Sequence, residues 1–455
     1  MNYGELISLQ DGYFRSHVTK NIDVRIAQLK KLKSILKAHE QELYNAIYAD
    51  FKKSEFDTYA TELGFVYGEI DTAIKKLPTW SKKTRTVTNV INLPGHSYVL
   101  QEPLGKCLII GAWNYPYMLS LIPLVSAIAA GNTVILKPSE IPSATSAIMR
   151  KLINDNFDPQ HLVVIEGGAP ETADLLSHKF DLIFFTGSTS VGKVVYQAAA
   201  KHLTPVILEL GGKSPAIITK NTNLQDAAKR ITWAKFLNAG QTCIAPDYVL
   251  IDESVRNEFL SLLKDQIIKS EYSFDHDNYV QIINDKNFKR LTALLDESKI
   301  YFGGETDIQN RYFAPTILSD VTFDDHIMGE EIFGPILPVI SYSNLDNAVE
   351  KINSRPKPLA CYIFTNDIRT REKLLKEISF GGGAVNDTMM QISNSHLPFG
   401  GVGESGFGSY HGKRGFDAFS HTKSIIDKPF WFEMNLKYPP YSKSKLTWIK
   451  RLMKL

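Results

Sequence analysis

A cysteine and a glutamate in this chain carry the groups needed to transform a carbonyl. Cys243 closes the stretch GQTC between a helix-like run and a strand-like run, which predicts a loop thiol with small neighbours. Glu209 closes an apolar run in ILELGGKSP, so its carboxylate is expected at a strand end. A thiolate can capture a carbonyl carbon, and a carboxylate can activate the water that hydrolyses the resulting thioester. A loop cysteine alone is more often inert than catalytic, so further site residues are required.

The other cysteines favour a structural interpretation. Cys107 and Cys361 lie inside apolar strand patterns, where a thiol packs as a small hydrophobic group. Three cysteines in 455 residues argue against a disulfide framework and favour a reducing cytoplasm. The cysteines and histidines show no spacing typical of a metal site, so we expect no bound metal.

A glycine-containing turn predicts an anion site. In FTGSTSVGKV, Gly187 and Ser188 follow an apolar strand and Gly192 opens a helix, where backbone N–H groups attract an anion. The run also approaches the nucleoside triphosphate loop GxxxxGK[ST], but Val194 stands where a magnesium-binding hydroxyl is needed. The dinucleotide fingerprint GxGxxG is absent, so the ligand of this helix start stays open on these residues alone.

Three further motifs place polar side chains beside apolar runs. Asn114 in GAWNYP could donate its amide to an oxyanion, or simply form a turn before a helix. Lys137 in LKPSE could contact a ribose or a phosphate, or be solvated. Glu331 in GEEIFGP stands beside Phe333 and a Phe-Gly-Pro turn, which favours a specific function over a solvated surface charge.

The motifs fit an α/β scaffold. Apolar strands are predicted within residues 107–111, 133–137, 162–168, 181–188 and 205–212, and helical runs separate them. This alternation predicts a parallel sheet that is covered on both faces and binds ligands at the carboxyl ends of its strands. Four candidate residues follow such ends: Asn114, Lys137, Ser188 and Glu209. A second α/β region, which contains the Cys243 loop, is expected after residue 212.

The flanking segments have other patterns. Residues 25–80 show helical periodicity, and residues 87–101 are β-rich around a Pro-Gly turn, which predicts a hairpin or a projecting arm. The glycine-rich residues 394–410 exclude a regular helix and are expected to cover a site. Residues 443–455 are basic and amphipathic, which suits a membrane surface, although a docked or frayed terminal helix is the commoner case.

The bulk composition excludes several classes of protein. Apolar content of 44% and charged content of 22% are those of a globular protein, and the length favours two large domains. A net charge of +2 without a basic run rich in aromatics predicts no nucleic-acid partner. The amino end has no signal-peptide pattern, and the longest apolar stretch, residues 118–131, contains a proline and is too short for a membrane span.

Taken together, these motifs resemble the aldehyde dehydrogenase superfamily. The matching stretches follow the family's order: GAWNYP, LKPSE, FTGSTSVGK, LELGGKSP, NAGQTC, EEIFGP and PFGGVGESGFG. The short amino end and the run SGFGSYHGKRGFDAFSHTK resemble its class 3 branch, which oxidises aliphatic and aromatic aldehydes. The resemblance implies two parallel-sheet α/β domains and an arm. Their expected bounds are 1–82 with 106–208 for NAD(P) binding, 209–390 for catalysis, 83–105 with 391–430 for the oligomerisation arm, and 431–455 for the tail.

The resemblance also assigns the chemistry. Cys243 would attack the aldehyde, and the Asn114 amide with the Cys243 backbone N–H would receive the oxyanion. Glu209 would activate the water that hydrolyses the thioester. Aromatic walls of the substrate channel are expected at Phe65, Tyr115 and Trp233, which could equally be ordinary core residues.

The cofactor contacts follow from the same resemblance. Lys137 and Glu140 would hold the adenine-side ribose, Ser188 with Gly187 and Gly192 the pyrophosphate, and Glu331 with Phe333 the nicotinamide ribose and ring. A carboxylate at Glu140 disfavours a 2′-phosphate by charge repulsion, so NAD is expected and NADP tolerated.

The expected protein is thus a cytoplasmic homodimer that oxidises an apolar aldehyde, whether fatty, aromatic or terpenoid, to its acid, with weak membrane-surface contact through the tail. A CoA-acylating or phosphorylating dehydrogenase on the same fold is the main alternative, and Glu209 argues against it because such relatives typically lack the base. A P-loop phosphotransferase and a purely structural protein are the remaining alternatives.

Overall fold

Short apolar runs form the strands of two separate sheets in the computed structural model, which describes residues 2–454. The first sheet has the order β17-β7-β6-β3-β4-β5 and is parallel except for β17. All residues of β4 and β6 are buried, as expected for strands with both faces covered. The strands are β3 (Lys106–Ile110), β4 (Thr133–Lys137), β5 (Leu162–Val164), β6 (Leu182–Thr186), β7 (Val206–Glu209) and β17 (Gly406–Phe407).

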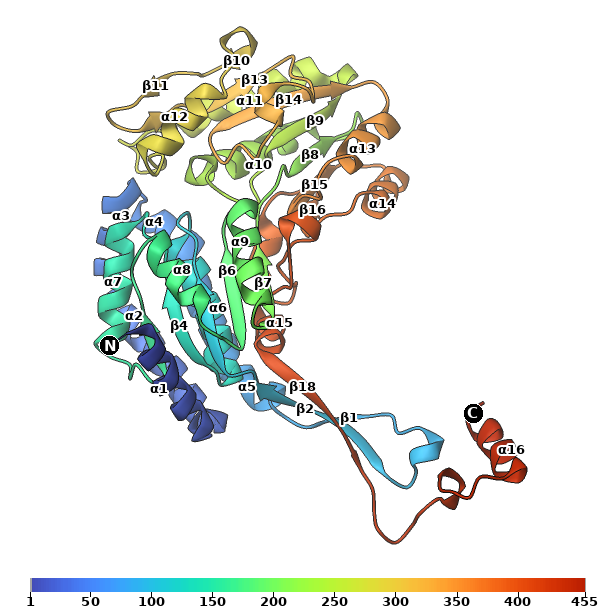
Figure 1. Ribbon diagram of the computed structural model, residues 1–455. Helices are drawn as coiled ribbons and strands as arrows, with labels where there is room; N and C mark the ends of the chain where they lie inside the picture. The colour runs from blue at the N-terminus through green and yellow to red at the C-terminus, as the bar shows by residue number, and fades with distance from the viewer. Residues whose placement is uncertain (1, 455) are drawn as a thin grey trace.

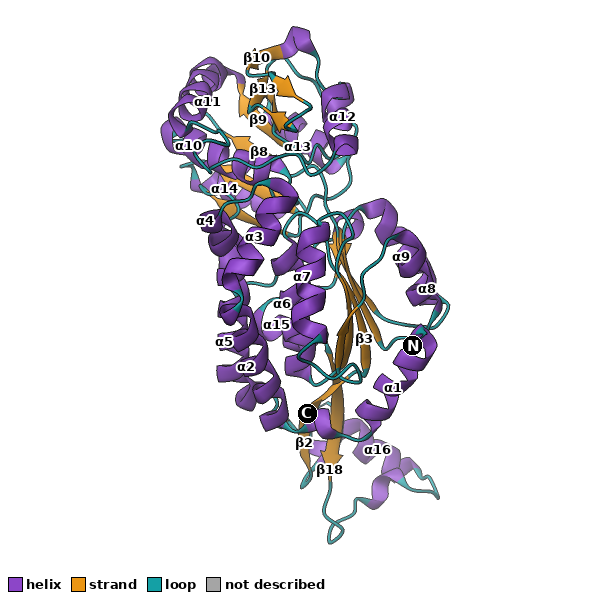
Figure 2. Cartoon of the chain, turned by 90° about the vertical axis from the view of Figure 1, so that its left-hand side faces the viewer, coloured by secondary structure: helices purple, strands orange, loops and turns teal. Residues whose placement is uncertain are grey.

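Helices cover both faces of this first sheet (Figure 2). On one face lie α2 (Ile22–Ala38), α5 (Gly64–Trp80), α6 (Pro116–Ala130), α7 (Ser143–Asn154) and α15 (Gly412–Ala418), and on the other lie α1 (Tyr3–Arg15), α8 (Ala169–Ser177) and α9 (Thr189–Ala200). Helix α6 is buried along its whole length. It begins at a proline and ends at Gly131, whose φ of 95° only glycine adopts without strain. Near α6 lie α3 (Glu40–Phe51), α4 (Glu55–Thr58) and a π-helical turn, Tyr59–Leu63.

The second sheet belongs to the region above the first in Figure 1. Its order is β10-β13-β14-β9-β8-β15-β16, and it is parallel except for β10. The strands are β8 (Pro215–Ile218), β9 (Tyr248–Asp252), β10 (Ile300–Phe302), β13 (Thr316–Leu318), β14 (Ile336–Tyr342), β15 (Ala360–Phe364) and β16 (Gly382–Val385). The helices are α10 (Leu224–Phe236), α11 (Arg256–Ser270), α12 (Asp285–Ala293), α13 (Leu345–Asn353) and α14 (Ile368–Glu377). A separate short hairpin is formed by β11 (Thr306–Asp307) and β12 (Tyr312–Phe313).

The two sheets meet end to end. In the first sheet the chain runs from β3 to β4 and β5 on one side, then returns to β6 and β7 on the other. Ligands of such sheets bind at this change of direction, outside the carboxyl ends of the strands. The Cys243 loop lies at the amino end of β9 in the second sheet. The site is therefore built from strand ends of opposite polarity, one set from each sheet.

A third, antiparallel sheet projects from the body (Figure 1). It consists of β1 (Thr84–Thr86), β2 (His96–Pro103) and β18 (Ser420–Asp427), and β18 pairs with β2 along its full length. This agrees with the projecting hairpin expected around residues 87–101. At its far end the chain carries α16 (Lys443–Leu452). Among residues 2–454, no helix is both long and apolar enough to cross a bilayer.

The arm is smaller than the sequence suggested. Residues 406–418 were expected in it, but β17 pairs with β7 and α15 packs on α5 and α6 in the first region. The reason is apolar burial: Tyr410 and Phe416 are completely enclosed there. Only β18 of the carboxyl-terminal segment joins the three-stranded sheet.

The contact between Glu69 and Gly412 makes the stability of the protein depend on pH. Its carboxylate accepts a hydrogen bond from the Gly412 N–H at 2.7 Å, and burial raises its pKa to about 7. The unfolded chain releases this proton near its ordinary value of 4.5. The folded state therefore binds more protons between these values, and the free energy of unfolding falls as pH rises through this window.

We expect Glu69→Gln to stabilise the protein at pH 8, by at most about 3 kcal/mol, and to change its stability little at pH 4. Urea unfolding at both pH values measures the effect. Glu350→Gln, at an exposed position, is the matched control. An equal effect of Glu69→Gln at both pH values would contradict the raised pKa of Glu69 in the folded protein.

Candidate active site

The loop that carries Cys243 has an unusual backbone. Asn238, Ala239 and Gly240 follow one another with φ values of 54°, 51° and 71°, which costs free energy at the two residues that are not glycine. A Cβ at Gly240 would lie 2.2 Å from the carbonyl oxygen of Gly334, so only glycine fits. The strained turn brings Cys243 to the junction of the two regions, half-buried.

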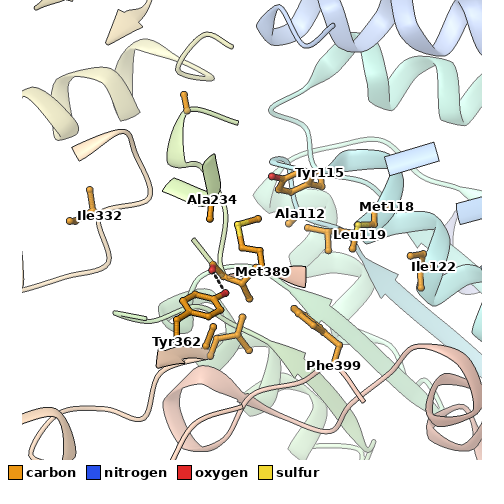
Figure 3. Packing of buried hydrophobic residues seen from close by; sticks show 14 of the residues in the cluster. Ala112, Tyr115, Met118, Leu119, Ile122, Ala234, Ile332, Tyr362, Met389 and Phe399 are labelled. Atoms are coloured by element: carbon orange, nitrogen blue, oxygen red, sulfur yellow. Dashed lines mark hydrogen bonds between the residues drawn. The ribbon is translucent and has the colours of Figure 1, made fainter. Parts of the chain in front are cut away.

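Hydrogen bonds fix the residues on both sides of Cys243. The Gln241 amide accepts the Ile283 N–H at 2.9 Å and donates to the Gln281 carbonyl at 3.1 Å. The hydroxyls of Thr242 and Tyr115 share a hydrogen bond of 2.7 Å. On the far side, the Tyr362 hydroxyl donates to the carbonyl of Ile244, the dashed contact in Figure 3. Sequence reasoning identified none of these supports except Tyr115, because their partners are distant in the chain.

Asn114 is tied directly to this loop. It lies between β3 and α6, buried, and its Nδ2 donates to the Gln241 carbonyl at 3.0 Å. Its own carbonyl accepts from Asn238 Nδ2 at 3.0 Å. An amide nitrogen has two N–H groups, and this contact uses one of them. The second N–H suits an oxyanion formed next to Cys243, and this function of Asn114 stays a prediction.

Glu209 is the last residue of β7 and is only 2% exposed. Neither carboxylate oxygen has a hydrogen-bond partner among the described residues, and burial raises the pKa of the group well above its usual range. The glycine-rich loop covers this strand end as predicted, because a Cβ at Gly406 would lie 2.0 Å from the Leu208 carbonyl. A buried carboxylate without partners is suited to take a proton from a water molecule.

Glu331 approaches the same place from the second region. Its carboxylate lies against Gly211, where a Cβ would come within 2.1 Å of Oε2. Burial, then the negative charge of Asp247, raises the pKa of Glu331 to about 8. Phe333, at a φ of 49°, places its ring 5.3 Å from that of Trp113. The contact of Glu331 with Gly211 places it next to the end of the first sheet, and its function in holding the nicotinamide ribose stays a prediction, as does that of Phe333 at the ring.

The remaining cofactor candidates follow β4 and β6. Lys137 is buried at the end of β4, and its Nζ donates to the Pro138 carbonyl at 3.2 Å and lies 3.7 Å from the exposed carboxylate of Glu140. Burial lowers the pKa of Lys137. Ser188 is the exposed N-cap of α9, and Gly187 precedes it directly after β6.

These groups fit a dinucleotide. The exposed start of α9 offers backbone N–H groups to a phosphate, and Lys137 and Glu140 offer a donor and an acceptor to ribose hydroxyls. Gly192 is buried in the first turns of α9, where a Cβ would lie 2.7 Å from Leu210, so glycine lets the helix pack closely on the strand end. The described residues contain no cluster that could hold a metal ion.

The three aromatic channel candidates lie in different environments. Tyr115 is buried and bonded to Thr242, beside the Cys243 loop. Phe65 is half-buried against the main core, and Trp233 on α10 is 41% exposed. Figure 3 places Tyr115 at the start of α6, close to Ala112 and Leu119. The function of all three as channel walls stays a prediction.

The thiol of Cys243 titrates in an unfavourable environment. Burial raises its pKa most, and the charges of Glu331 and Glu209 raise it further. Since Glu331 ionises only at about pH 8, its charge opposes thiolate formation mainly above that pH. We expect Glu331→Gln to shift the alkylation profile of Cys243 by iodoacetamide to lower pH. Measuring without cofactor separates this effect from dinucleotide binding. An unchanged or opposite shift would contradict the proximity of the two groups.

The fold and these motifs define a known class of enzyme. Residues 12–425 match the aldehyde dehydrogenase family, and the chain belongs to that family. It is an oxidoreductase that uses NAD(P) to oxidise aldehydes to acids. The matched residues span most of the two α/β regions and the arm, so the fold expected from the sequence is confirmed.

Particular relatives place the chain more closely. It is 46% identical to 4,4'-diaponeurosporen-aldehyde dehydrogenase of Staphylococcus aureus, over 97% of both chains. It is also 46% identical to aldehyde dehydrogenase family 3 member A2 of Mus musculus, over 96% of this chain and 91% of the relative. Identity to the dimeric NADP-preferring aldehyde dehydrogenase of Canis lupus familiaris is 43%, over 97% and 98%. The solved structure of the substrate-bound state of Staphylococcus aureus AldH has a TM-score of 0.97 and 45% identity over the whole of both chains. The class 3 resemblance is therefore confirmed.

Proposed function

We propose that this enzyme oxidises a long apolar aldehyde through a covalent Cys243 thioester that water hydrolyses with Glu209 as base. The observation that supports this proposal most directly is the buried Glu209 carboxylate. It has no hydrogen-bond partner among the described residues although it lies near the Cys243 loop. Enzymes that hand the acyl group to CoA or phosphate have no need of such a base. The buried base therefore favours hydrolysis over acyl transfer.

Each step is assigned to residues of this chain. Cys243 loses its thiol proton to water and its sulfur forms the C–S bond to the aldehyde carbon, and the carbonyl oxygen becomes an oxyanion held by the Asn114 amide. Bound NAD(P) supplies the hydride acceptor. Loss of hydride leaves the acyl group on Cys243 as a thioester. Glu209 then takes a proton from water, the water oxygen attacks the acyl carbon, and the C–S bond breaks so that Cys243 leaves as the thiolate and the acid is released.

The substrate class rests on two observations. The name of the Staphylococcus aureus relative gives 4,4'-diaponeurosporen-aldehyde as the compound acted upon. In this chain, the residues next to the Cys243 loop include the buried aromatic side chains of Tyr115 and Tyr362. We infer an apolar aldehyde of the terpenoid or fatty class, with NAD preferred because Glu140 repels a 2′-phosphate.

The name of the dog relative, dimeric and NADP-preferring, supports a homodimer and makes NADP a second cofactor.

Reduced cofactor formed with a panel of aldehydes tests the proposal. Short aliphatic, long aliphatic, aromatic and polyene aldehydes are compared with NAD and with NADP. We expect the highest kcat/KM with the long apolar aldehydes and NAD. CoA is then added, and acyl-CoA is sought in the products. Acyl-CoA formation faster than acid formation would replace hydrolysis by acyl transfer.

The tail is the part of the proposal that concerns membranes. Beyond the arm, Trp431 and Tyr441 are each 78% exposed, and α16 exposes Leu446 and Trp448 among its lysines. Exposed aromatic rings next to basic residues suit the interface of an anionic bilayer. We propose that this tail holds the enzyme weakly at a membrane surface, where apolar aldehydes concentrate.

Truncation after Ser442 is expected to lower the sedimentation of the enzyme with vesicles that contain anionic lipid by at least about tenfold at low salt, since each basic residue near such a surface contributes about 1 kcal/mol. The activity toward a short aldehyde serves as control and is expected to stay unchanged. Equal vesicle binding by the truncated and full chains would dismiss the anchor.

A further inference from the structure

We propose that the buried ion pair of Lys53 and Glu62 is a positioning device that holds the Asn114–Tyr115 segment against the Cys243 loop. Neither residue touches the reacting atoms, and neither belongs to the motifs of the cofactor or the nucleophile. The inference rests on the proposed function of Asn114 and adds the residues that aim its amide.

The pair is completely enclosed. Lys53 Nζ lies 2.7 Å from Glu62 Oε1, and the two side chains are 1% and 0% exposed. A buried pair of this kind costs so much desolvation that apolar residues of the same size often stabilise a protein as well or better. Stability alone is therefore a weak reason for its presence. Glu62 also lies in the π-helical turn Tyr59–Leu63, a local irregularity that is frequent near functional sites.

The second oxygen of Glu62 fixes the start of α6. Oε2 accepts the backbone N–H of Tyr117 at 2.8 Å and that of Met118 at 3.3 Å. These are the second and third residues of the helix, whose N-cap, Tyr115, makes no capping hydrogen bond with its own side chain. Glu62 thus supplies from another element the cap that the helix lacks, and its charge is favourable at the positive end of the helix dipole.

Lys53 fixes the residue just before the helix. Its ammonium lies 4.1 Å from the centre of the Tyr115 ring, a favourable cation–π contact in an enclosed site. The hydroxyl of that ring bonds Thr242, the neighbour of Cys243. Figure 3 shows the Tyr115 ring at the start of α6, above Ala112 in this view. The pair therefore acts on the same segment from both sides, through the helix start and through the ring.

Asn114 is the next residue back along the chain. Its amide bonds the Gln241 carbonyl, and its carbonyl accepts from Asn238, so it is held at the far side by the Cys243 loop. The Asn114 amide, the proposed oxyanion donor, is thus held between the Cys243 loop and the Lys53–Glu62 pair. Removal of the pair frees the start of α6 and lets the amide drift from the position at which the oxyanion forms. Small displacements of this kind cost roughly tenfold to a hundredfold in rate.

A thermodynamic cycle tests the proposal. The double variant Lys53→Met/Glu62→Met roughly keeps the side-chain volumes and removes both charges together with the acceptor for the start of α6, and it is made in the wild-type and the Asn114→Ala backgrounds. Single-turnover formation of reduced cofactor is measured at saturating NAD and aldehyde. We expect a fall of about tenfold in the wild-type background and of less than about twofold in the Asn114→Ala background, because residues that act through one another are not additive.

The matched control is a second linking ion pair, Asp11 with Lys106 at 3.1 Å, which joins α1 to the amino end of β3. Asp11→Asn/Lys106→Met is expected to leave the single-turnover rate unchanged. If this double variant is unstable, Lys53→Met/Glu62→Gln enters the same cycle with a smaller expected loss, since its amide oxygen still accepts from α6 and no unpaired charge is left buried.

The outcomes separate the inference from the function on which it rests. Equal losses in both backgrounds, or no loss in a folded variant, would overturn the positioning device. An Asn114→Ala variant with the full wild-type rate would instead overturn the proposed function of Asn114. A large loss in Asn114→Ala together with non-additivity supports both.

Discussion

Cys243→Ala is expected to lower the kcat of aldehyde oxidation by at least roughly 10⁴-fold, because the covalent intermediate forms on the Cys243 thiol. The described chain has only two other thiols, Cys107 and Cys361, and both are buried within strands. Formation of reduced cofactor with a long-chain aldehyde measures the loss. Because the cofactor residues are untouched, NAD binding by the variant should stay close to that of the wild type.

Cys361→Ala is the matched control for this variant. It also removes a single sulfur atom, but from β15 and not from the site. Its activity should therefore remain within about twofold of wild type, while its stability falls by a few kcal/mol at most. Full activity of Cys243→Ala would end the covalent mechanism. Loss of NAD binding by Cys243→Ala would point to a disturbed fold instead.

Glu209→Gln is expected to slow steady-state turnover by roughly 10²- to 10⁴-fold while the first turnover keeps its rate. The reason is that thioester formation needs Cys243 and Asn114, whereas only hydrolysis needs the base. A burst of reduced cofactor, equal to the number of sites, should precede slow turnover. Mass spectrometry of the quenched enzyme should then find the acyl group on the peptide that contains Cys243.

Hydroxylamine sharpens the Glu209 test. It attacks thioesters without the help of a base, so it should restore turnover of Glu209→Gln and should barely affect Cys243→Ala. In the wild type, the deacylation rate should rise with pH, because burial raises the pKa of Glu209 and only the ionised carboxylate accepts a proton. If the burst disappears in Glu209→Gln, the residue acts before the thioester and its assignment is wrong.

Local sequence patterns predict much of the secondary structure of this protein. Strands at residues 133–137 and 182–186 are fully buried and have apolar centres, and the helix that starts at Pro116 and ends before Gly131 has distinct signals at both ends. The arm was harder to delimit. Residues 406–418 return to the first region because their aromatic side chains are buried there, and glycine content alone does not reveal what a loop packs against.

Site residues were predictable where a single sequence motif contains the functional group. They were not predictable where the site depends on contacts between segments that are distant in the chain. Asn114 and Glu209 follow apolar strands, so their sequence context revealed them. The supports of the Cys243 loop, by contrast, come from Gln281 and Tyr362 far along the chain. The sequence placed Cys243 before a strand-like run, but it did not indicate that the amino end of this strand faces the carboxyl ends of another sheet. That arrangement depends on the order of strands in both sheets.

The return of the carboxyl-terminal segment also constrains how the chain folds. Asn132 donates to the Phe419 carbonyl across 287 residues, and Gly412 bonds Glu69 across 343 residues. The second α/β region is thus an insertion within the first. During synthesis, the first region has its edge strand β17 and its helix α15 only after the whole of the second has left the ribosome. Contacts of such long sequence separation form slowly, so the second region should complete its folding first and the first region last.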